Sequence, residues 1–293
     1  MNFVHYKNGN YNVHIDLDNG TKIRENNLDF FKPDYPESMD IKITNMCDMG
    51  CAFCHENSTE YGEHGDIMNL KFIDSLQPYT ELAIGGGNPL AHPDLLPFLK
   101  KCKELKLIPS MTVNQIHFHQ NIDFIRSLVN EKLIYGLGVS LVSPTPKFIK
   151  LIQEFPNAVI HVIAGIVAIE ELQKLANNGL KILLLGYKRF RRGEALYSVV
   201  PEHIEGKISI LKNKLKEITS WFDVVSFDNL AIKQLEPKRI LSDEEYDEFF
   251  MGEDGFATMY VDCVNKEFAV SSTSKERFPI KDNIKDMFEV VRK

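Results

Sequence analysis

Residues 38–54 read SMDIKITNMCDMGCAFC, and this stretch determines how the rest of the chain is interpreted. Its first part, SMDIKIT, has the alternating, β-branched composition of a strand. Three of the five cysteines in the chain, Cys47, Cys51 and Cys54, follow that strand within eight residues. Spacings this short allow one loop to surround a single metal centre.

Four interpretations of this cysteine loop are open on the residues alone. Cysteine is often a small apolar core residue, but these three lie between the polar segments TNM and HENS. A structural zinc site needs four nitrogen or sulfur ligands, and the candidate for the fourth, His55, directly follows Cys54. CAFCH also matches the C-x-x-C-H motif of covalent haem, although that attachment is normally made outside the cytoplasm. The favoured interpretation is a [4Fe–4S] cluster with three thiolate ligands, since no fourth cysteine lies near the loop.

Composition places the chain among ordinary globular proteins. It has 293 residues, of which 44% are hydrophobic and 26% are charged, and its net charge is −7. This acidic balance disfavours binding to a large nucleic acid or to an anionic membrane. No apolar run reaches the ~18 residues that a membrane span needs, and MNFVHYKNGN at the start lacks a signal-peptide pattern. We therefore expect a cytoplasmic protein, in which clustered cysteines indicate metal or redox chemistry.

Strands and helices alternate along residues 38–200. After the cysteine loop, the predicted strands are ELAI, IPSMTVN, YGLGVSLV, AVIHVIAGI and LKILLLGY, and the predicted helices between them are MNLKFIDSL, HPDLLPFLKKCKEL, NIDFIRSLVN, TPKFIKLIQEF and IEELQKLANNG. This alternation predicts a parallel sheet covered by helices. Six such units are too few for a closed eight-stranded barrel. The expected fold class is therefore α/β, a partial, open β/α barrel of about six parallel strands.

Two further regions flank the barrel, which we assign to residues 37–230. Residues 1–36 contain Asn-Gly turn signals between short alternating runs, and they predict a small antiparallel β meander. A long helical segment, EGKISILKNKLKEITSWF, and one more strand, VVSF, complete the barrel region. Residues 231–293 are expected to form a C-terminal α+β extension, with a hairpin in TMYVDCVNKEFAVSS and a closing helix in DNIKDMFEVV.

The cysteine loop resembles the signature of the radical S-adenosylmethionine (SAM) superfamily. That signature is C-x3-C-x-Φ-C with an aromatic residue at Φ, which is Phe53 here, itself a cofactor-binding candidate by this resemblance. The surrounding chain agrees, because the loop follows the first strand of a repeated β/α pattern over roughly 38–230. The resemblance implies a [4Fe–4S] cluster on the three cysteines, with SAM bound to the iron that has no protein ligand. It also implies reductive cleavage of SAM to a 5′-deoxyadenosyl radical that abstracts hydrogen from the substrate.

The segment ELAIGGGNP resembles the glycine motif of the same superfamily, which approaches the ammonium group of SAM. Glycines let the backbone come close to a ligand because no Cβ intervenes. Asn88 stands where the superfamily often has Glu; this removes a negative charge, although an amide oxygen can still accept a hydrogen bond. A tight turn without a ligand is the alternative, and Leu90 disfavours a dinucleotide motif. The cofactor-binding candidates in this segment are Gly85, Gly86, Gly87, Asn88 and Pro89.

Later strand ends supply further candidates for SAM binding. By resemblance to the superfamily, Asn114 and Ser140 would contact the ribose or carboxylate of SAM. The apolar segment from Ile163 to Gly165 would pack against the adenine. Capping of the strand ends is the alternative role for the two polar residues.

Three groups of residues are candidates for substrate or anion binding. Lys188, Arg191 and Arg192 belong to a dense basic cluster, KRFRR, which would bind carboxylate or phosphate or else form a solvated face. His117 is expected in a loop on the side of the sheet where the site lies, without a nearby carboxylate that would favour a metal site. Polar residues of the C-terminal region would shape a substrate pocket if this region returns over the open barrel, and the candidates there are Asp228 and Arg277.

These observations predict a radical SAM enzyme, an oxidoreductase or transferase that acts on a peptide or small molecule. A nucleoside substrate is the alternative within the superfamily, and a non-catalytic iron–sulfur or zinc-binding module is the alternative outside it. The expected cofactors are a [4Fe–4S] cluster and SAM, with no catalytic residue beyond them. Because iron–sulfur clusters can have quite negative potentials, the expected partner is a flavodoxin- or ferredoxin-like electron donor.

Overall fold

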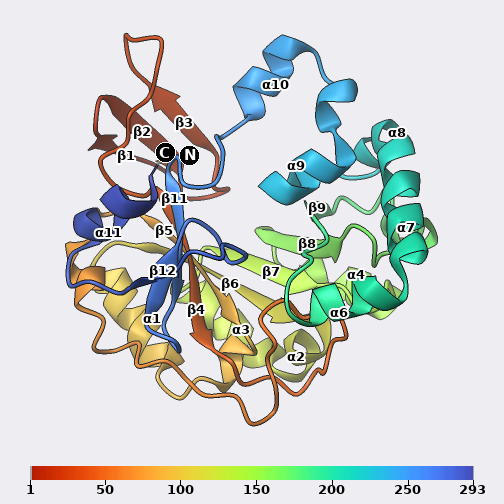
Figure 1. Cartoon of the computed structure of the whole chain (residues 1–293), viewed down its shortest axis with the longest axis horizontal. Helices are drawn as coiled ribbons and strands as arrows, with labels where there is room; N and C mark the ends of the chain where they lie inside the picture. Colours follow the sequence, from red (N-terminus) through yellow and green to blue (C-terminus); the bar gives the residue numbers. More distant parts are fainter. Residues whose placement is uncertain (1, 293) are drawn as a thin grey trace.

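A computed structural model describes residues 2–292 as two β-sheets with helices around them (Figure 1). The smaller sheet is antiparallel and contains β1 (Phe3–Asn8), β2 (Tyr11–Asp16) and β3 (Lys22–Glu25). The turn between β1 and β2 passes through Gly9 at φ +57°, a left-handed conformation that glycine adopts without strain. The predicted β meander is thereby confirmed.

The larger sheet has ten strands in the order β10-β9-β8-β7-β6-β5-β4-β11-β12-β13. Neighbouring strands from β10 to β11 are parallel, and the last two pairs are antiparallel. Six strands lie within residues 38–200 as predicted, and β10 is the additional strand VVSF. The parallel strands of the barrel are β4 (Ser38–Thr44), β5 (Glu81–Gly86), β6 (Ile108–Asn114), β7 (Gly136–Ser140), β8 (Ala158–Ile163), β9 (Lys181–Leu185) and β10 (Val224–Phe227).

The C-terminal hairpin extends the barrel sheet. It contains β11 (Thr258–Asp262) and β12 (Glu267–Ala269), and the short β13 (Phe278–Pro279) pairs with β12. The predicted hairpin is therefore confirmed. Strand β11 also pairs in parallel with β4, which the sequence did not suggest, and Figure 1 shows it beside that strand. The first strand of the barrel thus has a neighbour on both sides. The boundaries at residues 36 and 230 stay predictions.

Helices lie around the outer side of the curved sheet (Figure 1). Those that follow the barrel strands are α1 (Leu95–Glu104), α2 (Gln115–Gln120), α3 (Ile122–Asn130), α4 (Pro146–Ile152), α5 (Ile169–Leu175), α6 (Arg192–Val199), α7 (Pro201–Asn213), α8 (Leu215–Thr219) and α9 (Asn229–Leu235). The C-terminal region adds α10 (Asp243–Phe249) and α11 (Ile284–Val291). Three short 3-10 helices are η1 (Lys71–Ser75), η2 (Pro89–Ala91) and η3 (Pro237–Arg239). Within residues 2–292, no helix combines the length and hydropathy that crossing a membrane requires.

Two local predictions were wrong. MNLKFIDSL forms only the 3-10 helix η1, because Leu70 supplies no side-chain cap and Pro78 follows the segment closely. The segment QIHFHQ, expected as a loop, is the helix α2. The side chain of Asn114 caps α2 by accepting a hydrogen bond from the backbone N–H of Ile116 at 2.9 Å.

The two faces of β4 have different chemistry. Met39, Ile41 and Ile43 are buried in the main hydrophobic core under the helices. Because successive side chains of a strand alternate, Asp40 and Lys42 point to the inner side of the curved sheet. The sheet therefore encloses a polar lumen, and the cysteine loop leaves β4 at its carboxyl end.

Candidate functional site: the cysteine loop and the barrel lumen

The cysteine loop is held against the end of β4 by its own backbone. The N–H of Cys47 donates to the carbonyl of Thr59 at 2.7 Å, and the N–H of Thr59 donates to Asn45 at 3.0 Å. Further along, the N–H of Gly65 donates to the carbonyl of Ile43 at 2.8 Å. A long loop is thereby fixed at both of its ends, which limits the positions open to the cysteines between them.

The three cysteines of the loop lie close together as free thiols. Cys47, Cys51 and Cys54 are each half-buried, and none forms a disulfide. Burial raises the pKa of Cys47 and of Cys51; the charge of Cys54 raises both further, and that of Cys47 also raises the pKa of Cys51. That mutual effect requires short distances between the three side chains. No group of three or more His, Cys, Asp or Glu side chains in residues 2–292 converges as the ligands of one metal ion do.

Helix α2 contacts the cysteine loop through the side chain of His117. The Nε2 atom of His117 lies 2.6 Å from Oδ1 of Asp48, a loop residue that immediately follows Cys47. The His117 side chain is buried, and the hydrogen bond to it lowers the pKa of the Asp48 carboxyl group. The sequence placed His117 in a loop without a nearby carboxylate; the structure instead places it on a helix and pairs it with this Asp48.

The glycine motif at the end of β5 contacts the base of the cysteine loop. The N–H of Gly87 donates to Thr44 at 2.7 Å, and the N–H of Asn88 donates to Met46 at 2.6 Å. A Cβ on Gly87 would meet the carbonyl oxygen of Met46 at 2.2 Å, so this position requires glycine. A Cβ on Gly85 would meet nothing within 4 Å, so the backbone there borders open space in the lumen.

The remaining residues of this motif have local partners. The Oδ1 atom of Asn88 accepts a hydrogen bond from the N–H of Leu90 at 3.2 Å and caps η2. Pro89 is buried at the start of the same 3-10 helix. Gly86 has φ +111°, a value that side-chain-bearing residues rarely adopt. The close approach of the two loops thus explains most of the sequence GGGNP.

The candidates at later strand ends lie along one edge of the sheet. In the strand register, Asn114 is the partner of Ser140, and Ser140 is the partner of His161. Ile163 ends β8 and is half-buried. Gly165, at φ +85°, is buried, and a Cβ there would meet the side chain of Ile204 at 2.7 Å, so it packs against α7 rather than facing the lumen.

The basic segment after β9 contacts the cysteine loop. NH1 of Arg191 donates to the carbonyl of Glu56 at 2.8 Å, and Arg192 donates to the carbonyl of Ser58. The Nε atom of Arg192 is buried without a hydrogen-bond partner, and the charge of Arg192 acts on the thiols of Cys47 and Cys51. These two arginines therefore do not form a solvated face.

Lys188 faces the site from the same segment. Its Nζ atom lies 3.0 Å from Oγ of Ser272 and 3.4 Å from Nε2 of His55. Arg277 extends these contacts, since its NH2 atom donates to the carbonyl of Ser272 at 2.6 Å and its guanidinium lies over the ring of Tyr260. The C-terminal hairpin region and the basic segment thus meet beside the cysteine loop.

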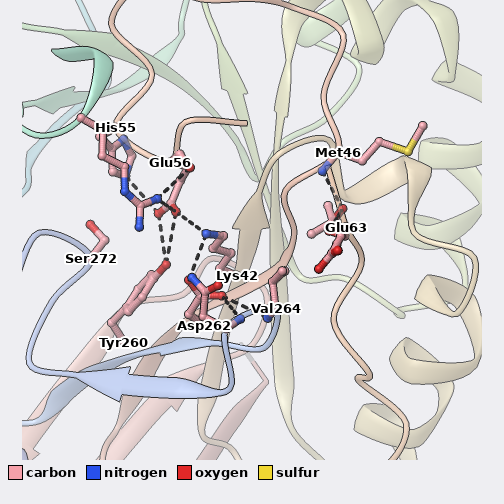
Figure 2. A network of polar contacts seen from close by, with 12 residues as sticks. Lys42, Met46, His55, Glu56, Glu63, Tyr260, Asp262, Val264 and Ser272 are labelled. Atoms are coloured by element: carbon pink, nitrogen blue, oxygen red, sulfur yellow. Dashed lines mark hydrogen bonds and ion pairs between the residues drawn. The ribbon is translucent and has the colours of Figure 1, made fainter. Parts of the chain in front are cut away.

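A buried ionic network joins β4, the loop and β11 (Figure 2). Nζ of Lys42 lies 3.0 Å from Oε2 of Glu56 and 2.9 Å from Oδ2 of Asp262. The hydroxyl of Tyr260 donates to both carboxylate oxygens of Glu56, at 3.2 and 3.3 Å. Burial alone would raise the pKa of Glu56, but the hydrogen bonds from His55 and Lys42 and the charge of Lys42 outweigh it, so the pKa falls and the carboxylate is ionised.

Sequence reasoning missed the roles of Lys42 and Tyr260 in this network. The signal was a polar side chain at alternate positions of two apolar strands, MDIKIT and MYVDCV. The network forms only because β4 pairs in parallel with β11, which makes Lys42 and Asp262 register partners.

A cavity of about 320 Å³ opens beside the start of β4, between the ends of the barrel sheet. Its lining includes Asp40, Asp228, Asn229, Asp254, Met251 and Ser271. Asp228 caps α9, because its Oδ1 accepts from the N–H of Ala231 at 2.7 Å and from that of Gly186 at 2.9 Å. Asn229 donates to Asp254 at 2.7 Å. The chain after β10 therefore borders this cavity.

Asp40, in the lining of this cavity, has a raised pKa. The Asp40 side chain faces the open lumen and is exposed to solvent there. The surrounding protein still removes part of its hydration, and this desolvation raises its pKa. The charge of Lys188 lowers the pKa, and those of Asp254 and Asp228 raise it again. His161, further along the lumen, has its pKa lowered to about 4 by burial and is neutral at physiological pH.

Asp40→Asn is expected to raise the melting temperature by about 2 °C at pH 7. The folded-state pKa of Asp40 is raised, so the ionised carboxylate destabilises the fold above that pKa, and protonation relieves the cost as the pH falls through it. The advantage of the variant should therefore shrink as the pH is lowered. Calorimetric melts over a pH series measure it, with the exposed Asp282→Asn as control; a variant that melts below wild type at pH 7 contradicts the prediction.

Comparison with known proteins identifies the fold. No protein-family model and no curated protein matches the chain. Among solved structures, Streptococcus suis SuiB bound to S-adenosylmethionine matches with a TM-score of 0.64 and 13% identity, over 98% of this chain and 87% of SuiB. SuiB bound to the precursor peptide SuiA matches over the same shares with a TM-score of 0.65 and 13% identity. A third SuiB structure matches with a TM-score of 0.55 and 13% identity, over 92% of this chain and 81% of SuiB. The chain therefore has the fold of SuiB, a protein solved with S-adenosylmethionine bound.

Proposed function

We propose that the protein is a radical SAM enzyme whose [4Fe–4S] cluster is bound by Cys47, Cys51 and Cys54. The observation that carries this proposal is the position of three neighbouring free thiols. They lie on a loop at the carboxyl end of β4, hydrogen-bonded to the glycine end of β5, in the fold of a protein solved with SAM bound. The carboxyl ends of parallel strands are the usual place for a site in such folds.

The residues present fit this cofactor pair. In a four-iron cluster each thiolate binds a different iron, which suits three neighbouring thiols that do not converge on one ion. The unpartnered Nε of Arg192 is a buried donor close to the thiols, and a sulfur acceptor there would satisfy it. The open space beside Gly85 leaves room for a ligand against the backbone.

SAM would lie between the cysteine loop and the strand ends. Gly85 and Gly86 would offer backbone to its ammonium group, while Asn114 and Ser140 would contact its polar groups. Because the Oδ1 atoms of Asn88 and Asn114 already accept backbone hydrogen bonds, their amide NH₂ groups are the freer contacts. When bound, the cluster and SAM supply a carbon-centred radical that removes hydrogen from the substrate. Ile163 and Phe53, both half-buried, would help to exclude water from that reaction.

The substrate that we propose is a peptide, with a small molecule as the alternative of similar chemistry. SuiB, which has the same fold, was solved with a precursor peptide bound. The cavity bordered by Asp40, Asp228 and Asn229 would admit part of such a substrate from the open side of the barrel. The contacts that Arg191 and Arg192 make to the cysteine loop weaken the case for a nucleoside, which depended on a free basic cluster.

The test is anaerobic reconstitution with iron and sulfide, followed by SAM and a strong reductant or a flavodoxin-like donor. We expect about four irons per chain, an absorption band that bleaches on reduction, and release of 5′-deoxyadenosine. Bound zinc in the purified protein, with no SAM cleavage after reconstitution, would instead identify a metal-binding module.

A further inference from the structure

We propose that Glu56 is a positioning residue that fixes the Cys54 end of the cysteine loop and connects it to the C-terminal hairpin. Glu56 is not a ligand of the cluster and is not assigned a role by the comparisons. The inference rests on the proposed cluster site, and it adds that the hairpin of β11 and β12 contributes to the geometry of that site.

The Glu56 side chain is in contact with four segments of the chain. It accepts from Lys42 of β4 at 3.0 Å and from the hydroxyl of Tyr260 of β11 at 3.2 Å. NH1 of Arg191, from the segment after β9, lies 3.7 Å from Oε2, and Nε2 of His55 lies 3.4 Å from Oε1. Figure 2 shows Glu56 between His55, Tyr260 and Lys42. Glu56 is therefore restrained by contacts from β4, β11, the segment after β9 and its own loop.

Burial makes these contacts strongly interdependent. The exposed fractions of the side chains are 1% for Lys42, 2% for Asp262 and 8% for Glu56. A buried charge that loses its partner is costly, so each member of the network restricts the others. Asp262 in turn accepts from the N–H groups of Val264 and Asn265, both at 3.0 Å, which fixes the turn of the hairpin. The position of Glu56 is therefore coupled to the hairpin through Lys42.

The backbone transmits this restraint to Cys54. Glu56 follows Cys54 by two residues, and Arg191 also donates to the Glu56 carbonyl at 2.8 Å. The N–H of Asn57 donates to the carbonyl of Cys54 at 3.3 Å, and the N–H of Cys54 donates to Cys51 at 3.2 Å. The carbonyl of Cys54 is thus held by Asn57, the residue next to Glu56, whereas Cys47 is held separately by Thr59.

The first test measures thiol alkylation, residue by residue, in the cluster-free protein by mass spectrometry. Glu56→Gln is expected to speed alkylation of Cys54 by roughly tenfold, because the loop opens locally more often. Tyr260→Phe, which keeps the ring and removes one donor, is expected to speed it by about threefold. Alkylation of Cys102, buried in α1, should stay unchanged in both variants.

Leu99→Ala in α1 is the control for stability, because Leu99 is fully buried in the core and makes no contact with the network. It should lower the melting temperature, while alkylation of Cys54 stays within about twofold of wild type. An equal acceleration in Leu99→Ala and Glu56→Gln would assign the effect to general loss of stability and overturn the proposal. If Glu56→Gln does not fold, Tyr260→Phe decides, and unchanged Cys54 alkylation in that variant also overturns it.

The second test uses the reconstituted protein and has a readout that a purely structural role would not change. Glu56→Gln and Tyr260→Phe should shift the midpoint potential of the cluster and alter the spectrum of its reduced form, whereas Asp282→Asn on the surface should not. Identical potentials and spectra in all proteins would reject the positioning role. A wild-type protein that takes up no cluster would instead reject the proposed function, and the alkylation comparison would still stand by itself.

Discussion

Replacing Cys51 by serine is expected to abolish cluster uptake and to reduce 5′-deoxyadenosine formation to background. Changes to residues that only support a metal ligand typically cost 10–100-fold in metal affinity or activity, so loss of a ligand should cost at least roughly 100-fold. Serine preserves the volume of the side chain but provides no thiolate. Iron and sulfide content after reconstitution, the visible spectrum and the yield of 5′-deoxyadenosine measure the effect.

Cys102→Ala is the matched control for this experiment. Cys102 is fully buried in α1, within the core and outside the cysteine loop. Its replacement should cost about 1 kcal/mol of unfolding free energy through lost packing, with cluster uptake unchanged. If Cys51→Ser retained its iron and its SAM cleavage, the three-thiolate site would be wrong.

The strand and helix pattern of the barrel followed from local sequence. Each of the six strands between residues 38 and 200 is a short apolar segment, helical segments follow β5 to β9, and the structure has all six strands. The cysteine loop was equally clear, because its signal lies within eight residues. The two local errors, at η1 and α2, arose where a capping residue was absent or was not recognised. A single side chain such as Asn114 can start a helix, and short segments give no periodicity that would reveal it.

The contacts between the C-terminal hairpin and the site could not be derived from sequence. Lys42 and Asp262 are 220 residues apart, and their ion pair exists because β11 adds to the edge of β4. Sequence patterns indicate which residues form strands, but they carry little information about which distant strand becomes a neighbour. The same reason explains why Arg191 and Arg192 were interpreted as anion-binding candidates. Their partners, the carbonyl groups of Glu56 and Ser58, lie in a loop more than 130 residues earlier.

The three glycines of the GGGNP motif have different surroundings, so substitutions at them should have different effects. A side chain on Gly86 would collide with the backbone of Thr44 at the end of β4, and one on Gly87 with the backbone of Met46 in the cysteine loop. Substitutions there would therefore disturb the fold as well as the site. Gly85 has no such neighbour, and it shares the inner face of the sheet with Lys42, its register partner on β4. Only Gly85 allows the space for SAM to be filled without displacing the loop.

Gly85→Leu is therefore expected to weaken SAM binding by roughly 100-fold, while the fold and the cluster are retained. The added side chain would occupy the space in which we place the ammonium group of SAM. Equilibrium binding to the reconstituted protein measures the affinity, and the melting temperature and iron content report the fold. Gly206→Leu on α7 is the control, since a Cβ there also meets nothing within 4 Å and the helix lies outside the lumen. Equal SAM affinity in both variants and wild type would place SAM elsewhere than against the end of β5.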